Sequence, residues 1–257
     1  MKPLKSTKRI ILVLFFVALG ILLSFFVFNK ESVAPQLEGK QVDPLEEYYV
    51  FWLNSKEHQV AFYWKDEKGA ILGNFRNLRS YLEDRDKELI FAMNGGIFDP
   101  GGIPKGLYIQ KSQTYQEIDL RGGEGNFYLQ PNGIFFLSNE GPKIIETSNY
   151  QEEDSIEFAL QSGPLLLENR VIHPEFNPES ESRFVRNGVG INEKGDVVFV
   201  LSKKRVTLHE FARFFKEDLK VDDALYLDGS ISRLYWPEMG LPFLGGDFGV
   251  MVGITSN

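Results

Sequence analysis

Short apolar runs separated by turn residues make up most of this chain, which is the pattern of a strand-rich protein. Aromatic and β-branched residues are frequent over residues 49–64, and they predict two strands joined around residues 54–58. Over residues 106–137, short runs that include 127–129 alternate with glycine, proline and asparagine turns, and predict a series of β-hairpins. Residues 183–202 predict a further hairpin of two strongly apolar strands.

Two segments have the residue spacing of helices. In residues 75–87 the apolar side chains fall on one helical face. Thr207 and Glu210 form a capping box that predicts a second helix running to about Leu219. The glycine-rich apolar stretch 240–254 predicts a closing strand. Because strands outnumber helices and no βαβ rhythm occurs, the sequence predicts an α+β fold of mixed or antiparallel sheets with flanking helices.

Three of the apolar runs end in small polar residues beside glycine, in segments 91–99, 158–165 and 224–232. A buried strand that ends in this way holds a polar side chain on a rigid element, and the glycine allows close approach of a ligand. A strand followed by a glycine turn explains any one junction. Three together predict a single site, whose candidate residues are Asn94, Gly95, Gly96, Asp99, Gln161, Ser162, Gly163, Asp228, Gly229, Ser230 and Ser232.

The first thirty residues differ in kind from the rest. Basic residues precede an uncharged run, 10–28, whose nineteen residues would span about 28 Å as a helix, close to the hydrocarbon thickness of a bilayer. The basic flank predicts that residues 1–30 are a cytoplasmic stub and signal anchor in the membrane, followed by a linker, 31–47, and one extracytoplasmic domain, 48–257, in the cell envelope. A cleaved signal peptide is the alternative, although the run is long for one and no small-x-small cleavage site follows it.

Composition excludes several classes of site. A net charge of −8 without a dominant basic cluster outside the N-terminus argues against nucleic acid as a partner. The absence of cysteine excludes disulfides, thiolate nucleophiles and thiolate metal sites. The three histidines lie in no triad or zinc motif. No cofactor is required by this pattern, but a calcium or magnesium ion held by carboxylate and carbonyl oxygens stays open.

The remaining candidate groups are carboxylates, amides, hydroxyls and two arginines. Asp228 and Asp99 suit glycosidic chemistry, in which carboxyl groups act on the leaving oxygen and on the sugar carbon. Arg183 and Arg186 supply guanidinium forks that suit a phosphate. A substrate with both a sugar and a phosphodiester would use the whole set. The simpler interpretations are an Asx turn at Asp228 and a surface ion pair at Arg186.

Six motifs occur in order along the chain: AMNGGIFDP at 92–100, GLYI at 106–109, GNF at 125–127 with PNG at 131–133, QSGP at 161–164, RNGVG at 186–190 and YLDGSIS at 226–232. Over residues 49–254 this series resembles the phosphodiester glycosidase family, and most closely its exported bacterial branch. That family includes the enzyme that removes N-acetylglucosamine to uncover mannose 6-phosphate. The resemblance implies an α+β fold, hydrolysis of a glycosyl-1-phosphodiester to free sugar and phosphomonoester, and a site that includes Asn94, Gly95, Gly96, Ser162, Gly163, Arg186, Asp228, Gly229 and Ser230.

Two features depart from the family pattern. Ser230 follows Gly229 directly, where many relatives have a longer glycine run, and the cysteine-rich extensions of the uncovering enzyme are absent. The fold and the site position therefore carry over better than the substrate does. Two other functions stay open: a non-catalytic envelope protein that binds a glycan or peptidoglycan fragment, and a metal-dependent phosphodiesterase. The sequence specifies neither the sugar, nor the aglycone, nor the oligomeric state.

Overall fold

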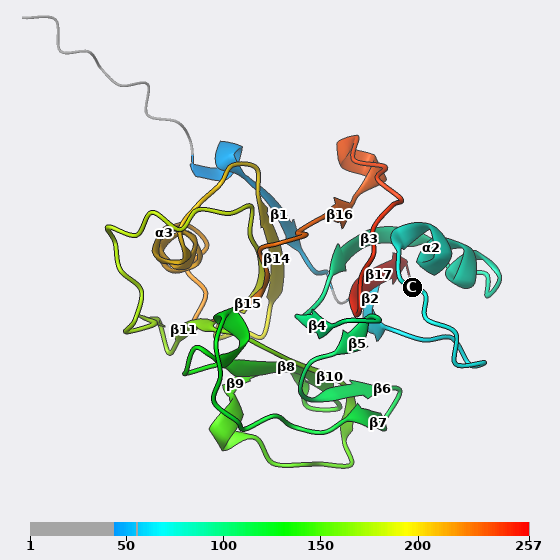
Figure 1. Cartoon of the computed structure of the whole chain (residues 1–257). Helices are drawn as coiled ribbons and strands as arrows, with labels where there is room; N and C mark the ends of the chain where they lie inside the picture. Colours follow the sequence, from blue (N-terminus) through cyan, green and yellow to red (C-terminus); the bar gives the residue numbers. More distant parts are fainter. Residues whose placement is uncertain (1–43, 55, 257) are drawn as a thin grey trace, which may run out of the picture. The chain divides into compact units, whose positions relative to one another are not determined.

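A computed structural model describes residues 44–54 and 56–256, in which all pairings between the named strands are antiparallel (Figure 1). The first sheet has six strands in the order β1-β14-β13-β15-β11-β12. These strands are β1 (Tyr48–Trp52), β11 (Leu165–Glu168), β12 (Val171–Ile172), β13 (Asn187–Ile191), β14 (Val197–Ser202) and β15 (Asp223–Asp228).

Two further sheets complete the β-structure. The second has the order β7-β6-β10-β8-β9 and the third has the order β16-β3-β17-β2. The second consists of β6 (Tyr108–Gln110), β7 (Gln113–Gln116), β8 (Gly133–Ser138), β9 (Gly141–Glu146) and β10 (Ile156–Ser162). The third consists of β2 (His58–Tyr63), β3 (Leu89–Asn94), β16 (Leu234–Tyr235) and β17 (Met251–Ser256), and a small hairpin adds β4 (Phe98–Asp99) and β5 (Ile103–Pro104).

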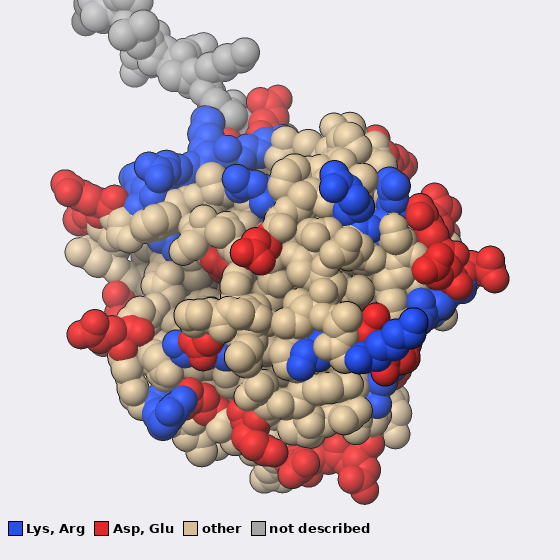
Figure 2. Space-filling view, turned by 45° about the vertical axis from the view of Figure 1, so that its right-hand side comes forward, with Lys and Arg blue, Asp and Glu red and all other residues tan. Residues whose placement is uncertain are grey.

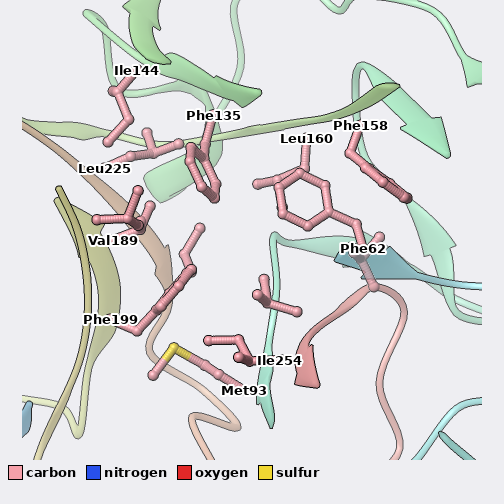
Figure 3. Close-up of a cluster of buried hydrophobic side chains, with 14 of the residues drawn as sticks. Phe62, Met93, Phe135, Ile144, Phe158, Leu160, Val189, Phe199, Leu225 and Ile254 are labelled. Carbon is pink, nitrogen blue, oxygen red and sulfur yellow. The ribbon is translucent and has the colours of Figure 1, made fainter. Parts of the chain in front are cut away.

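The three sheets share one core, to which each contributes apolar side chains (Figure 3). Phe199 comes from the first sheet, Phe135 and Leu160 from the second, and Phe62 and Ile254 from the third, and each is at most 2 % exposed. Alternate residues of a strand face the same side, so these runs place one large side chain in the core at every second position. Burial of each such side chain stabilises the fold by about 1.5–3 kcal/mol.

Helices cover the other faces of two sheets. Helix α2 (Phe75–Glu83), capped by Asn74, buries Leu78 against the third sheet. Helix α3 (Leu208–Arg213) starts at the predicted Thr207 capping box and continues into the π-helical turn η4 (Phe214–Asp218). Together they pack Phe211, Phe214 and Phe215 against the first sheet. Short 3₁₀ turns are η1 (Pro44–Glu47), η2 (Asn126–Tyr128), η3 (Thr147–Asn149) and η5 (Pro237–Met239).

The expected α+β class is confirmed, one expected strand is wrong, and the expected closing strand is shorter than predicted. Residues 127–129 lie in and after η2, which follows Gly125 at a φ of 88°. In the stretch 240–254 only the residues from Met251 onward form a strand. Gly240 and Gly246 have φ values of 71° and 123°, which lie outside the range of a strand and turn the chain before β17 begins.

The predicted membrane anchor, residues 10–28, lies outside the described residues. Within residues 44–54 and 56–256, no helix is long and apolar enough to cross a bilayer. The anchor and the linker therefore stay predictions.

Candidate active site

The three polar junctions lie side by side at the ends of β3, β10 and β15. The Asn94 Nδ2 atom donates to Asp228 Oδ2 over 3.1 Å, and Ser162 Oγ donates to the carbonyl oxygen of Leu227 over 3.2 Å. Asn94 and Asp228 belong to different sheets, and the chain after β15 crosses between those sheets to β16, which pairs with β3. The candidate site therefore lies where the strands of three sheets end together.

Asp228 is held by hydrogen bonds to both oxygens of its carboxylate. Its Oδ1 accepts from the backbone N–H groups of Gly229 at 2.5 Å and Ser230 at 2.8 Å, while Oδ2 accepts from Asn94. The side chain is buried, and burial raises the pKa of the carboxyl group, although these hydrogen bonds act in the opposite direction. The Asx turn considered from the sequence is thus present, and it fixes a carboxylate whose proton affinity is increased.

A network of hydrogen-bonded amide and hydroxyl groups contacts Asp228. Asn94 Oδ1 accepts from Asn187 Nδ2 at 3.2 Å and from the backbone N–H of Arg233 at 2.8 Å. Ser232 Oγ donates to the carbonyl oxygen of Asp228 at 2.9 Å and lies 3.3 Å from Asn187 Oδ1. Since Asn94 uses its oxygen for two donors, its amide nitrogen is directed toward Asp228. This network sets the orientation of the carboxylate.

Tyr226 lies on the same strand as Asp228, two residues before it, and its hydroxyl is close to two donors. It accepts from Arg186 Nη1 at 3.1 Å and lies 3.4 Å from Asn126 Nδ2. Burial raises the pKa of Tyr226 to about 12, so the hydroxyl keeps its proton at neutral pH. Among the described residues no acceptor is close enough to receive that proton in a hydrogen bond. The hydroxyl therefore has a hydrogen to donate.

Arg186 is a buried cation, 1 % exposed. Its other nitrogens donate to backbone carbonyl oxygens, Nε to Val206 at 2.8 Å and Nη2 to Ser182 at 3.0 Å. Burial lowers its pKa, yet a guanidinium group stays charged in proteins. No carboxylate among the described residues forms an ion pair with it, so the surface-pair interpretation of Arg186 is wrong. A buried charge without a counter-ion is costly, and an anion bound nearby would offset that cost.

A pocket of about 490 Å³ opens beside these groups. Its lining residues are Ile97, Phe98, Gly125, Asn126, Ser182, Phe184, Tyr226, Asp228, Gly229, Ser230 and Ile231. Asp228 is the only carboxylate in this lining. Arg186 lies directly behind the wall, because its contacts Tyr226, Ser182 and Phe184 all line the pocket. A Cβ atom on Gly229 would collide with the Tyr226 hydroxyl, so only glycine allows this close approach.

Several predicted site residues shape the site without lining the pocket. Gln161 is 1 % exposed, and its side chain bridges backbone groups of Leu107 and Asp119. Gly95 donates its backbone N–H to the Val250 carbonyl oxygen. A Cβ atom on Gly96 or Gly163 would press on neighbouring backbone oxygens, at 3.1 and 3.0 Å respectively. These residues pack the ends of β3 and β10 closely against neighbouring backbone segments.

Asp99 and Arg183 lie outside the pocket lining. Asp99 forms an ion pair with Lys105 at 3.3 Å and half of its side chain is exposed. Arg183 forms a two-pronged ion pair with Glu210 on the surface, with distances of 2.7 and 2.8 Å. Of the predicted polar side chains, the structure therefore gathers Asn94, Asp228 and Ser232 in one network, with Ser230 in the pocket lining.

Tyr226, Asn126 and Asn187 were missed as candidate site residues. Tyr226 had a usable signal, because residues two apart on a strand face the same side and Asp228 follows it at that spacing. Asn126 and Asn187 lie within two of the six motifs, but neither belongs to one of the three polar junctions. Among the described residues, no group of three or more His, Asp and Glu side chains is arranged to hold a metal ion.

A family model described as phosphodiester glycosidase matches residues 87–243, which is more than half of the chain and includes Asn94, Arg186 and Asp228. The chain belongs to the phosphodiester glycosidase family, and the resemblance inferred from the sequence is confirmed. It is 35 % identical over 212 residues to YigE of Escherichia coli K12, described as an uncharacterized protein, and the match covers 82 % of this chain and 83 % of YigE.

Two solved structures share the fold. One is the catalytic domain of zebrafish N-acetylglucosamine-1-phosphodiester alpha-N-acetylglucosaminidase, auto-inhibited by its pro-peptide, with a TM-score of 0.55, 14 % identity, and coverage of 81 % of this chain and 82 % of that one. The other is a hypothetical protein from Synechocystis, with a TM-score of 0.51, 14 % identity, and coverage of 82 % of this chain and 59 % of that one. At these identities the likeness establishes the fold alone.

Proposed function

We propose that this chain hydrolyses glycosyl-1-phosphodiesters by breaking the bond between the sugar C1 atom and its bridging oxygen. The products are a free sugar and a phosphomonoester. Family membership supports the general activity, and the named activity of the zebrafish protein supports the substrate class. The observation that carries the proposal is a pocket whose lining has one carboxylate, Asp228, and a tyrosine, Tyr226, whose hydroxyl is hydrogen-bonded to the buried cation Arg186.

One carboxylate is sufficient for this leaving group. Most glycosidases use two carboxyl groups, because one must protonate the departing oxygen. A phosphomonoester is already a stable anion at neutral pH and departs without that proton. Positive charge and hydrogen-bond donors then take the place of the acid, since they stabilise charge that develops in the transition state. The Tyr226 hydroxyl donates a hydrogen bond to the departing phosphate oxygen. Arg186 donates to the same hydroxyl, and its positive charge makes that hydroxyl a stronger donor.

Asp228 acts at the sugar carbon in its ionised form. It either attacks C1 to form a glycosyl intermediate, which water then hydrolyses, or takes a proton from the water that attacks C1. In both routes the C1–O bond breaks, its electron pair leaves with the phosphate, and water supplies the new C1 hydroxyl group. The anomeric configuration of the first-formed sugar, read by NMR, distinguishes the two routes.

A substrate panel tests the proposal. The full chain is incubated with glycosyl-1-phosphodiesters of several sugars, with and without a chelator. We expect a free reducing sugar and a phosphomonoester, at a rate that the chelator leaves unchanged. A sugar 1-phosphate with a free alcohol, formed only without chelator, would instead identify a metal-dependent phosphodiesterase. Binding without products would identify a glycan-binding protein.

The pH dependence of the reaction should report on Asp228. Burial raises the pKa of this carboxyl group, and the ionised form is the reactive one. The rate should therefore be full above this raised pKa and fall as the pH drops through it, at a pH above the ordinary aspartate value of about 3.9. The measurement is kcat/KM as a function of pH, with folding checked at each pH by circular dichroism. An acid limb at or below the ordinary value would contradict this assignment.

Tyr226→Phe removes the proposed donor and keeps the buried ring. We expect kcat/KM for a phosphodiester to fall by about 10- to 100-fold, the effect of losing a hydrogen bond to a charged group. Tyr63→Phe is the matched control, because Tyr63 is a buried tyrosine of the third sheet that does not line the pocket. Equal rates for the two variants would remove Tyr226 from the mechanism.

We further propose that the domain works on the extracytoplasmic side of a membrane, held there by residues 10–28. The support is the basic flank and the length of that apolar run. Protease added outside intact spheroplasts should release a fragment that begins within the linker. A domain that lacks its first thirty residues and is found free in the medium would show cleavage instead.

A further inference from the structure

The rim of the pocket carries an aromatic ring, Phe184, and a nearby cation, Arg205, neither of which has a role in the proposed reaction. Phe184 lines the pocket and is 41 % exposed. Its backbone is fixed by reciprocal hydrogen bonds with Val206 of 3.1 and 2.8 Å. The guanidinium carbons of Arg186 and Arg205 lie 5.3 and 5.9 Å from the ring centroid. An exposed ring on a fixed backbone at a pocket mouth offers a face on which a sugar ring can stack.

Charge pairing distinguishes Arg205 from its basic neighbours. Arg183 is paired with Glu210 at 2.7 Å, and Lys204 is paired with Glu47 at 2.6 Å. Within residues 44–54 and 56–256, Arg205 has no carboxylate within ion-pair distance. Figure 2 shows Lys and Arg side chains gathered at the upper left of the molecule. Arg205, the exposed cation near the Phe184 ring, thus lacks an acidic partner.

The acidic side chains near Arg205 do not form an ion pair with it. Arg205 also lines a neighbouring pocket of about 370 Å³, together with Glu47, Glu210 and Asp218. Glu47 and Glu210 bind Lys204 and Arg183, as described above, and Asp218 has contacts of its own. Arg205 is exposed and contacts the Phe184 ring, so its guanidinium group is accessible from the rim of the catalytic pocket.

Arg186 and Arg205 lie near the same ring but differ in their access to a ligand. Because their guanidinium carbons lie 5.3 and 5.9 Å from one ring centroid, they are no more than about 11 Å apart. Arg186 is buried and acts through Tyr226, so Arg205 is the cation that can contact an anionic group of the ligand directly, beside a sugar ring stacked on Phe184. Since Asp228 acts on the sugar carbon at one side of the scissile phosphate, we assign the group at Arg205 to the other side, the aglycone.

We infer that Phe184 and Arg205 form an aglycone subsite for a second sugar phosphate. This inference rests on the proposed function and narrows it, because the preferred substrate is then a chain of repeating sugar phosphates rather than an isolated diester. The subsite binds the neighbouring sugar ring on Phe184 and its phosphate at Arg205.

Two probes test the subsite. One is the methyl diester of N-acetylglucosamine 1-phosphate, and the other is a dimer whose aglycone is a second N-acetylglucosamine 1-phosphate. The wild-type chain should use the dimer with a kcat/KM about fivefold higher at low salt, and added salt should reduce this preference. Arg205→Met should abolish the preference and leave the methyl diester unaffected. Lys204→Met alters a neighbour that is also exposed but is ion-paired with Glu47, and it should keep the preference.

The outcomes separate the two claims. If the methyl diester is cleaved but the dimer is no better, or if both variants lose the preference equally, the subsite is wrong and the proposed function stands. If neither probe is cleaved, calorimetric binding of the same two probes decides. Binding of the dimer that is about fivefold weaker in Arg205→Met alone supports the subsite, and equal binding in all three proteins overturns it.

Discussion

Asp228→Asn should lower turnover of a glycosyl phosphodiester by at least about a hundredfold, the scale of a lost acid–base or charge-stabilising group. The substitution keeps the size of the side chain and the acceptor for the Gly229 and Ser230 N–H groups, but removes the negative charge. Rates are measured under saturating and limiting substrate, so that kcat and kcat/KM are obtained separately. Both should fall, because the charge acts on the reacting carbon.

The thermal midpoint of this variant should move little, because two effects oppose each other. The raised pKa of Asp228 means that the ionised group costs stability at pH values above it, and asparagine removes that cost. The new amide nitrogen, however, faces Asn94 Nδ2, so a hydrogen bond is lost. Asp223→Asn is the matched control, because Asp223 lies on the same strand and burial raises its pKa too, yet it does not line the pocket. Equal turnover in the two variants would remove Asp228 from the mechanism.

Arg186→Lys should reduce kcat/KM by about 10- to 100-fold although the charge is kept. The guanidinium group donates in three directions, to Val206, Ser182 and Tyr226, and an ammonium group at the end of a flexible chain cannot reproduce that geometry. Loss of the contact to Tyr226 should also weaken phosphate binding, which the inhibition constant of the phosphomonoester product measures.

The inhibition constant separates a role in phosphate binding from a role in folding. Arg186 also holds two backbone carbonyl oxygens, so some loss of stability is expected and the thermal midpoint is recorded. A purely structural arginine would lower the fraction of active protein and leave product inhibition of the remainder unchanged. Arg213→Lys makes the same substitution at an exposed ion pair with Glu217, so it is the control for effects of the substitution on preparation and folding.

Local pattern predicted most of the strands but not the turns that separate them. Alternation and aromatic or β-branched content identify β1 and β2, which keep partly exposed positions, whereas a continuous apolar run identifies the hairpin of β13 and β14, which are buried along their whole length. The segment before Met251 is equally apolar, yet it is not a strand. Gly240 and Gly246 adopt positive φ, and the Phe248 N–H donates to the Gly73 carbonyl oxygen instead of to a neighbouring strand. Sequence spacing carries no information about such a long-range partner.

The three polar junctions lie together as expected, but the sequence did not show which of their side chains face the pocket. Neighbouring residues on a strand face opposite sides, so not every polar side chain near a strand end can face the ligand. Gln161 therefore faces Leu107 and Asp119, while Asp228 and Tyr226 share the pocket. Which face is turned to the pocket depends on how the three sheets meet, and that is decided by packing between distant segments.

The bond that is broken is the central claim, and hydrolysis in oxygen-18 water tests it most directly. A glycosyl phosphodiester that the chain cleaves is converted in labelled water, and the phosphomonoester is examined by phosphorus NMR and mass spectrometry. Attack of water-derived oxygen at the sugar carbon leaves the phosphomonoester unlabelled and puts the label on the sugar, which is the result we predict. Label in the phosphomonoester would show attack at phosphorus and would contradict a glycosidase mechanism built on Asp228.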